Sequence, residues 1–390
     1  MKLPQLLAAG WRVFFLSAGL FGAGAMLLWL HWLTAGDSFL PFDRAPQMWH
    51  AHEMIFGFAG AALGGFFLTA VPNWTGARAA PRRFILMVSA LWLAGRVAVG
   101  LAGWLPPVLV ALVDLAFLPV LGAKILTQLL ARPKPQNMMF LLMLTLTWLG
   151  DLLVHLDWIG LTQTESQGLR GGMLAICAMI ATLGGRVTPA FTRNALVRAG
   201  QEARLPVSRP RLDMAGIALA ILTAASVLAG APDGLSGGLA VAAGVVAALR
   251  LAGWRGLALP GQPIVWALHL GYAMLALGLV MWGASLWGLG SETGALHVLA
   301  IGAIGGMTLA VMSRAALGHS GRDLVAPWPV ALGYAALPVA VLLRWLASVW
   351  VVVYWPAIIA SGVIWVLVFA GFTLTLWPVF MRPRIDGKEG

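Results

Sequence analysis

The sequence predicts an all-α integral membrane protein, a polytopic helical bundle of about 12 transmembrane helices. Of its 390 residues, 60% are hydrophobic and only 10% are charged, and 19 tryptophans stand against 3 tyrosines, which is unlike a soluble domain. Apolar runs of about 20 residues, the length that crosses a bilayer core, recur along the whole chain. Because hydrocarbon offers backbone groups no hydrogen-bond partner, these runs must form helices.

The expected spans follow one another with no soluble domain between them. They lie near residues 11–32, 52–72, 84–104, 107–130, 138–158, 171–190, 213–230, 235–252, 263–287, 294–313, 328–347 and 350–379. The last run is long for one crossing, which a tilted helix would accommodate. We therefore expect a single transmembrane domain over residues 1–390. Two candidate halves, 1–212 and 213–390, would be joined by a basic cytoplasmic loop at 191–212.

The placement of lysine and arginine predicts the orientation, because positively charged loops stay in the cytoplasm. With the N-terminus inside, the opposite side has Arg44 and Arg170, with Arg344 near it. The inside segments collect many more basic residues, among them Arg78, Arg82, Arg83, Lys124, Arg132, Lys134, Arg186, Arg193, Arg198, Arg250, Arg255, Arg314, Arg322, Arg382 and Arg384. Both termini are therefore expected in the cytoplasm. The net charge of +11 is explained by this rule and by anionic lipid, so we expect no nucleic-acid partner.

Ionisable residues inside the spans are functional candidates, because a charge in hydrocarbon costs at least about 2.5 kcal/mol. Two histidines, His269 and His319, lie toward the cytoplasmic side. The others lie in the outer half, namely His31 in the first span, His50, His52 and Glu53 in the second, Arg96 in the third, Asp114 in the fourth, Asp151 and His155 in the fifth, and His297 in the tenth. Cys177 is the only cysteine, which excludes a disulfide within the chain, a cysteine-ligated iron–sulfur cluster and a C-x-x-C-H haem attachment.

Several of these residues also have structural interpretations. Arg96 and Asp114 match in depth on consecutive spans, and an ion pair is the preferred interpretation. Asp151 and His155, spaced i, i+4, are expected mainly to hydrogen-bond to each other.

The glycines that follow Glu53 have two readings. Gly57, Gly60 and Gly64 form one face, for which helix packing is favoured over a cofactor platform.

For His52 beside Glu53 a functional role is favoured, because burying an imidazole next to a carboxylate brings no packing advantage. On a helix, His50 and His52 would point about 200° apart, so both can serve one centre only if the chain is extended at His50.

Four stretches of the chain resemble one known family. They are WHAHEMIFGFAGAALGGFFLTAVPNWTG at 49–76, GGRVTPAFTRNAL at 184–196, HLGYAMLALGL at 269–279 and ALHVLAIGAIGGMTLAVMSRAALGHSGR at 295–322. They are similar to the signature segments of the NnrS family, twelve-span bacterial inner-membrane proteins of the response to nitric oxide and nitrosative stress. The resemblance implies haem (heme, held non-covalently as b-type) and copper as cofactors, and nitric oxide as the small-molecule ligand.

The resemblance also supplies the candidate site residues. It implies metal ligands among His50, His52, His269, His297 and His319, and it brings in Arg186, Asn194, Arg314 and Arg322 as motif residues. The cytoplasmic-end positions of these four residues suit binding of an anionic group such as a haem propionate, and the positive-inside rule explains the arginines there equally well. Our assignment places His50, His52 and His297 in an outer centre and His269 and His319 in an inner one. Glu53 would orient a ligand or supply protons in the outer centre. Tyr272, one turn after His269, would be a hydrogen-bond donor in the inner one.

The leading functional hypothesis is a haem- and copper-binding protein that binds or converts nitric oxide at histidine-ligated metal. Whether it is an enzyme stays open, because no electron-entry site is visible and the electron donor is unknown. The alternative is a proton-coupled secondary transporter of a metal ion or small solute, with Glu53, Arg96, Asp114 and Asp151 as a relay. Against it, no convincing repeat relates residues 1–212 to 213–390. A homo-oligomer in the bilayer is also left open.

Overall fold

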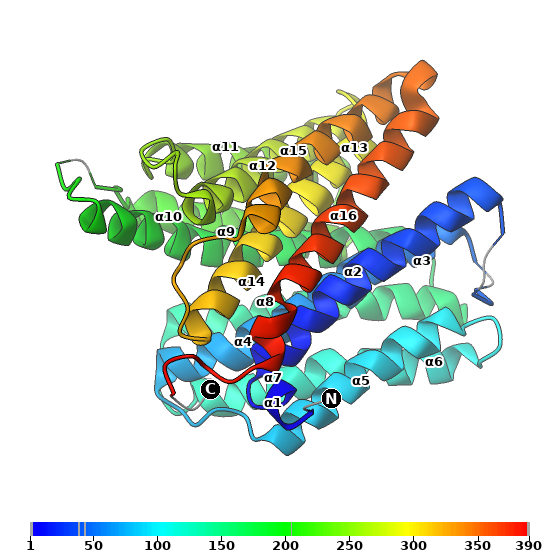
Figure 1. The fold of residues 1–390 in the computed structure, drawn as a ribbon. Helices are drawn as coiled ribbons and strands as arrows, with labels where there is room; N and C mark the ends of the chain where they lie inside the picture. The colour runs from blue at the N-terminus through cyan, green and yellow to red at the C-terminus, as the bar shows by residue number, and fades with distance from the viewer. Residues whose placement is uncertain (1–2, 38–39, 43, 204, 388–390) are drawn as a thin grey trace. The chain divides into compact units, whose positions relative to one another are not determined.

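The computed structural model describes residues 3–37, 40–42, 44–203 and 205–387, and it is helical throughout its regular elements (Figure 1). Within these residues, 12 helical segments are long and apolar enough to cross a membrane, and no strand is present. The expected all-α bundle is therefore confirmed, and the chain is a multi-pass membrane protein.

The helices fall into two compact units, of which the first comprises Met1–Gly172, Met312–Asp323 and Phe369–Gly390. Its spans begin with α2 (Gly10–Ala35), and the next span is built from three consecutive elements. The remaining elements of this unit are α1 (Leu3–Leu6), α3 (Pro46–His52), the π-helix η1 (Glu53–Phe58), α4 (Ala59–Thr75), α5 (Arg82–Gly100), α6 (Pro107–Leu115), α7 (Phe117–Leu129) and α8 (Pro135–Ile159).

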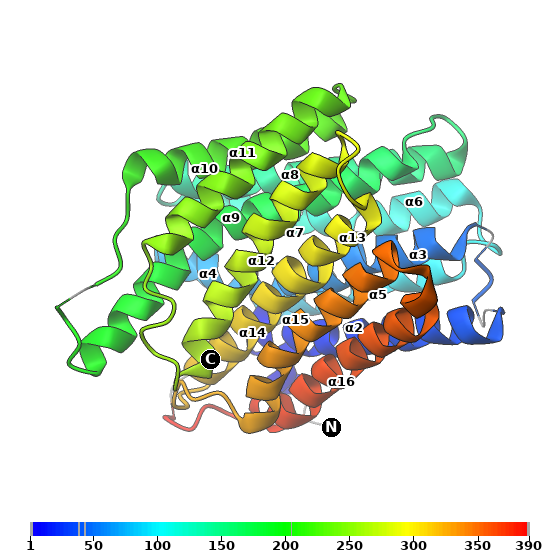
Figure 2. The same cartoon turned by 90° about the horizontal axis from the view of Figure 1, so that it is seen from above.

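The second unit comprises Met173–Val311 and Leu324–Val368. Figure 2 shows α10, α11 and α12 side by side in it. Its elements are α10 (Pro210–Leu228), α11 (Asp233–Ala252), α12 (Pro263–Ser285), α13 (Glu292–His297), the π-helix η2 (Val298–Gly305), α15 (Trp328–Val349) and η3 (Val351–Val353). Three helices contribute to both units, namely α9 (Glu165–Arg198), α14 (Gly306–His319) and α16 (Tyr354–Met381). The halves 1–212 and 213–390 stay a prediction, and α9 continues through Arg198 into the expected loop.

Small residues let helices within a unit approach closely. In the first unit, a Cβ added to Gly150 of α8 would lie 2.7 Å from the backbone of Gly168 and Gly172 on α9. In the second, a Cβ at Gly237 of α11 would lie 2.8 Å from the carbonyl oxygen of Gly283 on α12. In a bilayer, where lipid tails are as apolar as leucine, such close backbone contact is a main source of helix association.

The fourth span breaks after Leu115, the residue that follows Asp114, and the break has a local cause. Pro119 has no N–H to donate to the carbonyl of Leu115 four residues earlier, so a normal helical hydrogen bond is missing. The indole Nε1 of Trp148 on α8 donates to that carbonyl instead, at 3.1 Å. The break separates α6 from α7 and leaves Asp114 in the last turn of α6.

Candidate metal centre

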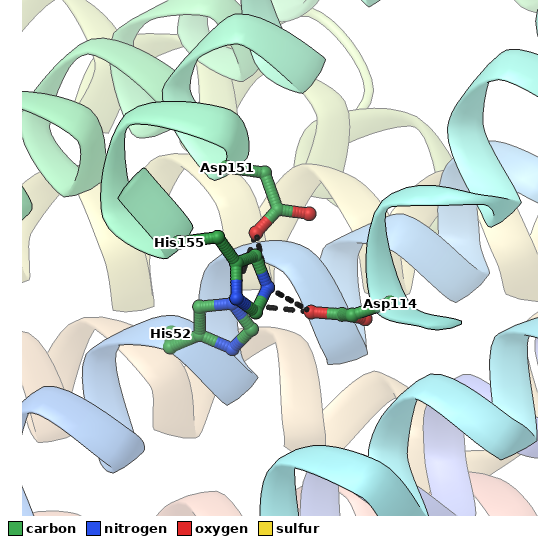
Figure 3. Close-up of side chains that lie close together, drawn as sticks. All are labelled: His52, Asp114, Asp151 and His155. Carbon is green, nitrogen blue, oxygen red and sulfur yellow. Dashed lines mark hydrogen bonds and ion pairs between the residues drawn. The ribbon is translucent and has the colours of Figure 1, made fainter. Parts of the chain in front are cut away.

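Four buried side chains from three spans converge on one point in the first unit (Figure 3). They are His52 from α3, Asp114 from α6, and Asp151 and His155 from α8, here called the His52 cluster. Each offers one ligand atom, and these atoms all lie within 4.8 Å of one another. None of the four side chains is accessible beyond a few per cent of its surface.

The two imidazoles point their Nε2 atoms at the two aspartates. His52 Nε2 lies 2.9 Å from Asp151 Oδ1 and 3.3 Å from Asp114 Oδ2. His155 Nε2 lies 3.0 Å from the same Asp114 oxygen and 3.7 Å from Asp151 Oδ1. Two nitrogens and two oxygens therefore face a common centre.

Glu53 and Arg96 surround this centre and hold its ligand side chains. Glu53 Oε1 accepts a hydrogen bond from His52 Nδ1 at 3.0 Å and another from Arg96 Nη1 at 2.6 Å. The Arg96 Nη2 donates to Asp114 Oδ1, which leaves Oδ2 for the cluster. A carboxylate on the far nitrogen of a histidine fixes the ring and raises its basicity as a metal ligand.

Aromatic rings and glycines shape the walls of the site. The Trp158 ring lies 4.9 Å from the His52 ring and 5.1 Å from the His155 ring, and its Nε1 donates to Glu165 at 2.7 Å. A Cβ at Gly95 would overlap the carboxylate of Asp114, so only glycine lets α5 lie this close to α6. The cluster is therefore enclosed by packing that excludes bulk water.

Local structure explains how distant residues reach this point. Asp151 and His155 lie one helical turn apart on the same face of α8. Arg96 and Asp114 face each other near the turn between α5 and α6. His52 is the last residue of α3, where the helix widens into η1; π-helical turns are rare and often mark functional sites.

The donor set fits a divalent transition-metal ion. Imidazole nitrogens and carboxylate oxygens are the ligands that Cu²⁺, Zn²⁺ and Fe²⁺ accept, whereas Cu⁺ prefers sulfur donors. The four side chains leave no room for a macrocycle between them, because their donor atoms lie within 4.8 Å of one another. The cluster therefore suits a bare ion and not a haem iron.

The other predicted histidines are not members of the His52 cluster. Helix α3 begins at Pro46, so the chain is not extended at His50, and the condition for His50 and His52 to share a centre is not met. The His50 ring instead stacks on Trp29, with centroids 4.6 Å apart. The predicted outer and inner centres each combine residues of both units, because His297 and His269 belong to the second and His319 to the first. Both groupings stay predictions.

The histidines outside the cluster have local partners of their own. His269 Nε2 lies 2.8 Å from Thr192 Oγ1, and His297 Nδ1 lies 2.7 Å from the carbonyl of Thr293. The His319 ring stacks on Trp11 at 6.4 Å. Each of these side chains is therefore oriented by a neighbour within its own unit.

Tyr272 belongs to a separate network in the second unit. Its hydroxyl accepts a hydrogen bond from Arg250 Nη1 at 2.5 Å and donates to the carbonyl of Ala181 at 3.3 Å. Arg250 also donates through Nε to Asp213 Oδ1 at 2.8 Å, so this network ties α9, α10, α11 and α12 together. The other predicted cofactor contacts belong to two elements: Arg186 and Asn194 lie on α9, Arg314 is buried on α14, and Arg322 follows α14.

The sequence favours structural pairs for four residues, Asp114, Asp151, His155 and Arg96. The expected Arg96–Asp114 ion pair is present, and Asp114 also pairs with His52 and His155. The expected pair of Asp151 and His155 is the longest contact in the cluster, and both bond more closely to other members. Their common depth in the outer half of consecutive spans was the sequence signal that could have joined them.

Comparison with known proteins agrees with this architecture. No curated protein matches the chain. The profile of the family described as NnrS protein matches residues 5–384, nearly the whole sequence. A buried histidine and aspartate group within a twelve-span helical bundle fits a metal-binding membrane protein. By this match, the chain belongs to the NnrS family.

Proposed function

We propose that this protein binds a divalent transition-metal ion, copper being the first candidate, at the His52 cluster and acts in the response to nitric oxide and nitrosative stress. The observation that carries the proposal is the convergence of four buried donor atoms within 4.8 Å. The role in nitric oxide defence rests on membership of the NnrS family and on the family character set out above. The bacterial inner membrane is the proposed location.

The charge of the site supports a cation. Glu53, Asp114 and Asp151 bring three negative charges, and Arg96 brings one positive charge. With both imidazoles neutral, two negative charges remain unbalanced in a buried site, where uncompensated charge is strongly destabilising. A divalent ion would balance them.

The surrounding residues have definable roles toward such an ion. Glu53 accepts a hydrogen bond from His52 Nδ1, so that His52 Nε2 faces the metal position. Arg96 donates hydrogen bonds to Glu53 and to Asp114 Oδ1. Trp158 covers both imidazoles and excludes water. A bound copper ion would supply a redox-active centre with affinity for nitric oxide. Glu53 is the proposed carrier of protons to this centre.

Haem is the second proposed cofactor, by family resemblance. Its candidate ligands are His50, His269, His297 and His319, and its candidate polar contacts are Arg186, Asn194, Arg314 and Arg322. Haem iron with an open position binds nitric oxide.

A proton-coupled transporter is the second candidate function, because two protons on His52 and His155 would balance the same two charges. The buried carboxylates and Arg96 would then form the relay. Transport predicts uptake of a divalent ion into proteoliposomes that depends on a pH gradient. Stable stoichiometric binding without flux would count against it.

The test measures metal content and the absorption spectrum of the detergent-purified protein, oxidised, reduced and exposed to nitric oxide. His155→Gln is the test variant, and His31→Gln is the matched control, because His31 also pairs with an aspartate, Asp37, at 3.2 Å but is partly exposed. We expect wild type and His31→Gln to hold about one divalent ion and His155→Gln to lose most of it. Equal metal content in all three proteins would overturn the proposal.

A further inference from the structure

The His52 cluster lies near one end of the spans that carry it. His155 is four residues before the end of α8, and His52 is six residues after the start of α3. At 1.5 Å per residue, these separations are about 6 Å and 9 Å along the helix axes. The other end of the His52 span, at Thr75, is about 35 Å away along the same axis. An ion therefore has its shorter path at the end of the first unit that contains Arg44, here called the Arg44 side.

Toward the middle of the span, the cluster is closed by tightly packed helices. The Phe56 ring, one turn after His52, lies 5.0 Å from the His52 ring, and Phe56 is 3% exposed. A Cβ added to Gly172 of α9 would lie 2.7 Å from the Phe56 ring. Gly172 in turn lies so close to α8 that a Cβ at Gly150 would be 2.7 Å from its backbone. Moving Phe56 would therefore require whole helices to separate.

Trp158 is the side chain that covers the cluster on the Arg44 side. Its ring lies 4.9 Å from the His52 ring and 5.1 Å from the His155 ring, and 4% of its surface is exposed. Trp158 lies in the last turn of α8, which ends at the left-handed Gly160 with φ 87°. The indole ring therefore stands between the two imidazoles and the end of the span.

Contacts from α9 and from the α2–α3 connection hold the Trp158 ring in place. Its Nε1 donates to Glu165 Oε1 on α9 at 2.7 Å. Arg44 Nη2 donates to the carbonyl of Trp158 at 2.5 Å, and the guanidinium carbon lies 5.9 Å from the ring centroid. The Phe42 ring meets the indole edge-on, with centroids 5.6 Å apart. Of these contacts, the directional bond to Glu165 is the one that fixes the rotation of the indole.

The backbone around Trp158 is fixed, so its side chain is the part that can move. Thr164 Oγ1 donates to a carbonyl of α8 at 2.8 Å, and the N–H of Glu165 donates to Asp157 Oδ2 at 3.0 Å. These two bonds tie the end of α8 to the start of α9. A side chain leaves its place by a change of rotamer, which is far faster than the movement of helices that opening at Phe56 would need.

We infer that Trp158 is the gate through which a divalent ion enters and leaves the His52 cluster from the Arg44 side, and that Glu165 holds this gate closed. This role rests on the proposed function and deepens it, because it assigns the path of the ion. Asp157 and Glu165 place two partly exposed carboxylates beside the gate, where they raise the local concentration of cations. The positive-inside rule predicts that this side is the outer one.

The test follows exchange of the ion in the full-length purified protein. Copper-loaded protein is mixed with excess EDTA to measure release, and metal-free protein is mixed with Cu²⁺ to measure entry. Trp158→Phe keeps an aromatic ring but removes the N–H donor, so entry and release should both be at least about tenfold faster. Because a gate lowers the barrier equally in both directions, the Kd should stay within about twofold of the wild-type value.

Two further variants and a vesicle experiment complete the test. Glu165→Gln replaces a charged acceptor by a neutral one and should speed release to a smaller extent, and it gives the decision if Trp158→Phe does not fold. Trp282→Phe is the matched control, because Trp282 Nε1 donates to Glu292 at 3.3 Å in the second unit; its exchange rates should equal those of the wild type. In sealed vesicles of known orientation, EDTA should remove the ion from the Arg44 side alone.

The outcomes separate this inference from the proposed function. Wild-type release rates in Trp158→Phe and Glu165→Gln, or removal of the ion by EDTA from the opposite side, would overturn the gate and leave the metal site standing. A wild-type release rate that rises in proportion to the EDTA concentration would overturn it too, because the chelator would then reach the ion through an open site. A changed Kd with an unchanged entry rate in Trp158→Phe would show that Trp158 only shapes the site. A wild-type protein that holds no divalent ion would refute both proposals.

Discussion

Replacing Arg96 by methionine tests whether the His52 cluster is held together by charge. Arg96 donates to Glu53 and to Asp114, whose side chains are each 1% exposed. Methionine keeps much of the apolar volume but removes the guanidinium, so two carboxylates lose their buried partner. Breaking a buried ion pair from one side costs about 3–5 kcal/mol, and we expect a loss of this size in the free energy of unfolding.

The assay is unfolding in mixed micelles with increasing denaturing detergent, followed by tryptophan fluorescence. Arg384→Met is the matched control, because Arg384 also pairs with a carboxylate, that of Asp386, at the surface, where such pairs contribute about 0–1 kcal/mol. Adding Glu53→Gln to Arg96→Met should recover part of the loss, since it removes one uncompensated charge. A loss for Arg96→Met no larger than that of the control would refute the reasoning.

Three further perturbations follow from the same contacts. Gly95→Ala places a Cβ on the Asp114 carboxylate and should lower the free energy of unfolding by about 1–3 kcal/mol and also lower the metal content. The control Gly24→Ala, which has open space around the added Cβ, should change neither quantity. Equal melting temperatures of the two variants would contradict this prediction. A divalent ion at 100 times its Kd should stabilise the wild type by about 2.7 kcal/mol and leave Asp151→Asn unaffected, and equal shifts in both proteins would place the ion elsewhere. Arg250→Met breaks the network of the second unit and should cost about 3–5 kcal/mol while the cluster keeps its metal; loss of metal in this variant would link the two networks.

Sequence reasoning found the members of the cluster without finding the cluster. The sequence favours a functional role for His52 and Glu53, because an imidazole next to a carboxylate in an apolar span brings no packing advantage. Asp114, Asp151 and His155 lie at a similar depth in their spans, but the sequence favours a pair within one span or between adjacent spans for each of them. The sequence gives the depth of a residue in the bilayer. It says little about how a helix is rotated about its own axis or which helices lie beside it.

The hydrophobic periodicity of the sequence does not predict the two π-helices either. Periodicity assumes 3.6 residues per turn, and η1 and η2 shift the register of the residues after His52 and His297. The expected sixth span ends near residue 190, but helical hydrogen bonding in α9 continues to Arg198. Hydropathy follows the bilayer, whereas a helix ends where its backbone partners end.

The sequence by itself determined the membrane class, the number of spans and the family, because bilayer thickness and the lack of hydrogen-bond partners in lipid leave one solution for long apolar runs. It also marked the ionisable residues that a membrane protein retains only for a purpose. The tertiary structure decided which of them meet. His52, Asp114, Asp151 and His155 lie on three spans, and only the packing at Gly95, the break after Asp114 and the widened turn after His52 bring their donor atoms within 4.8 Å.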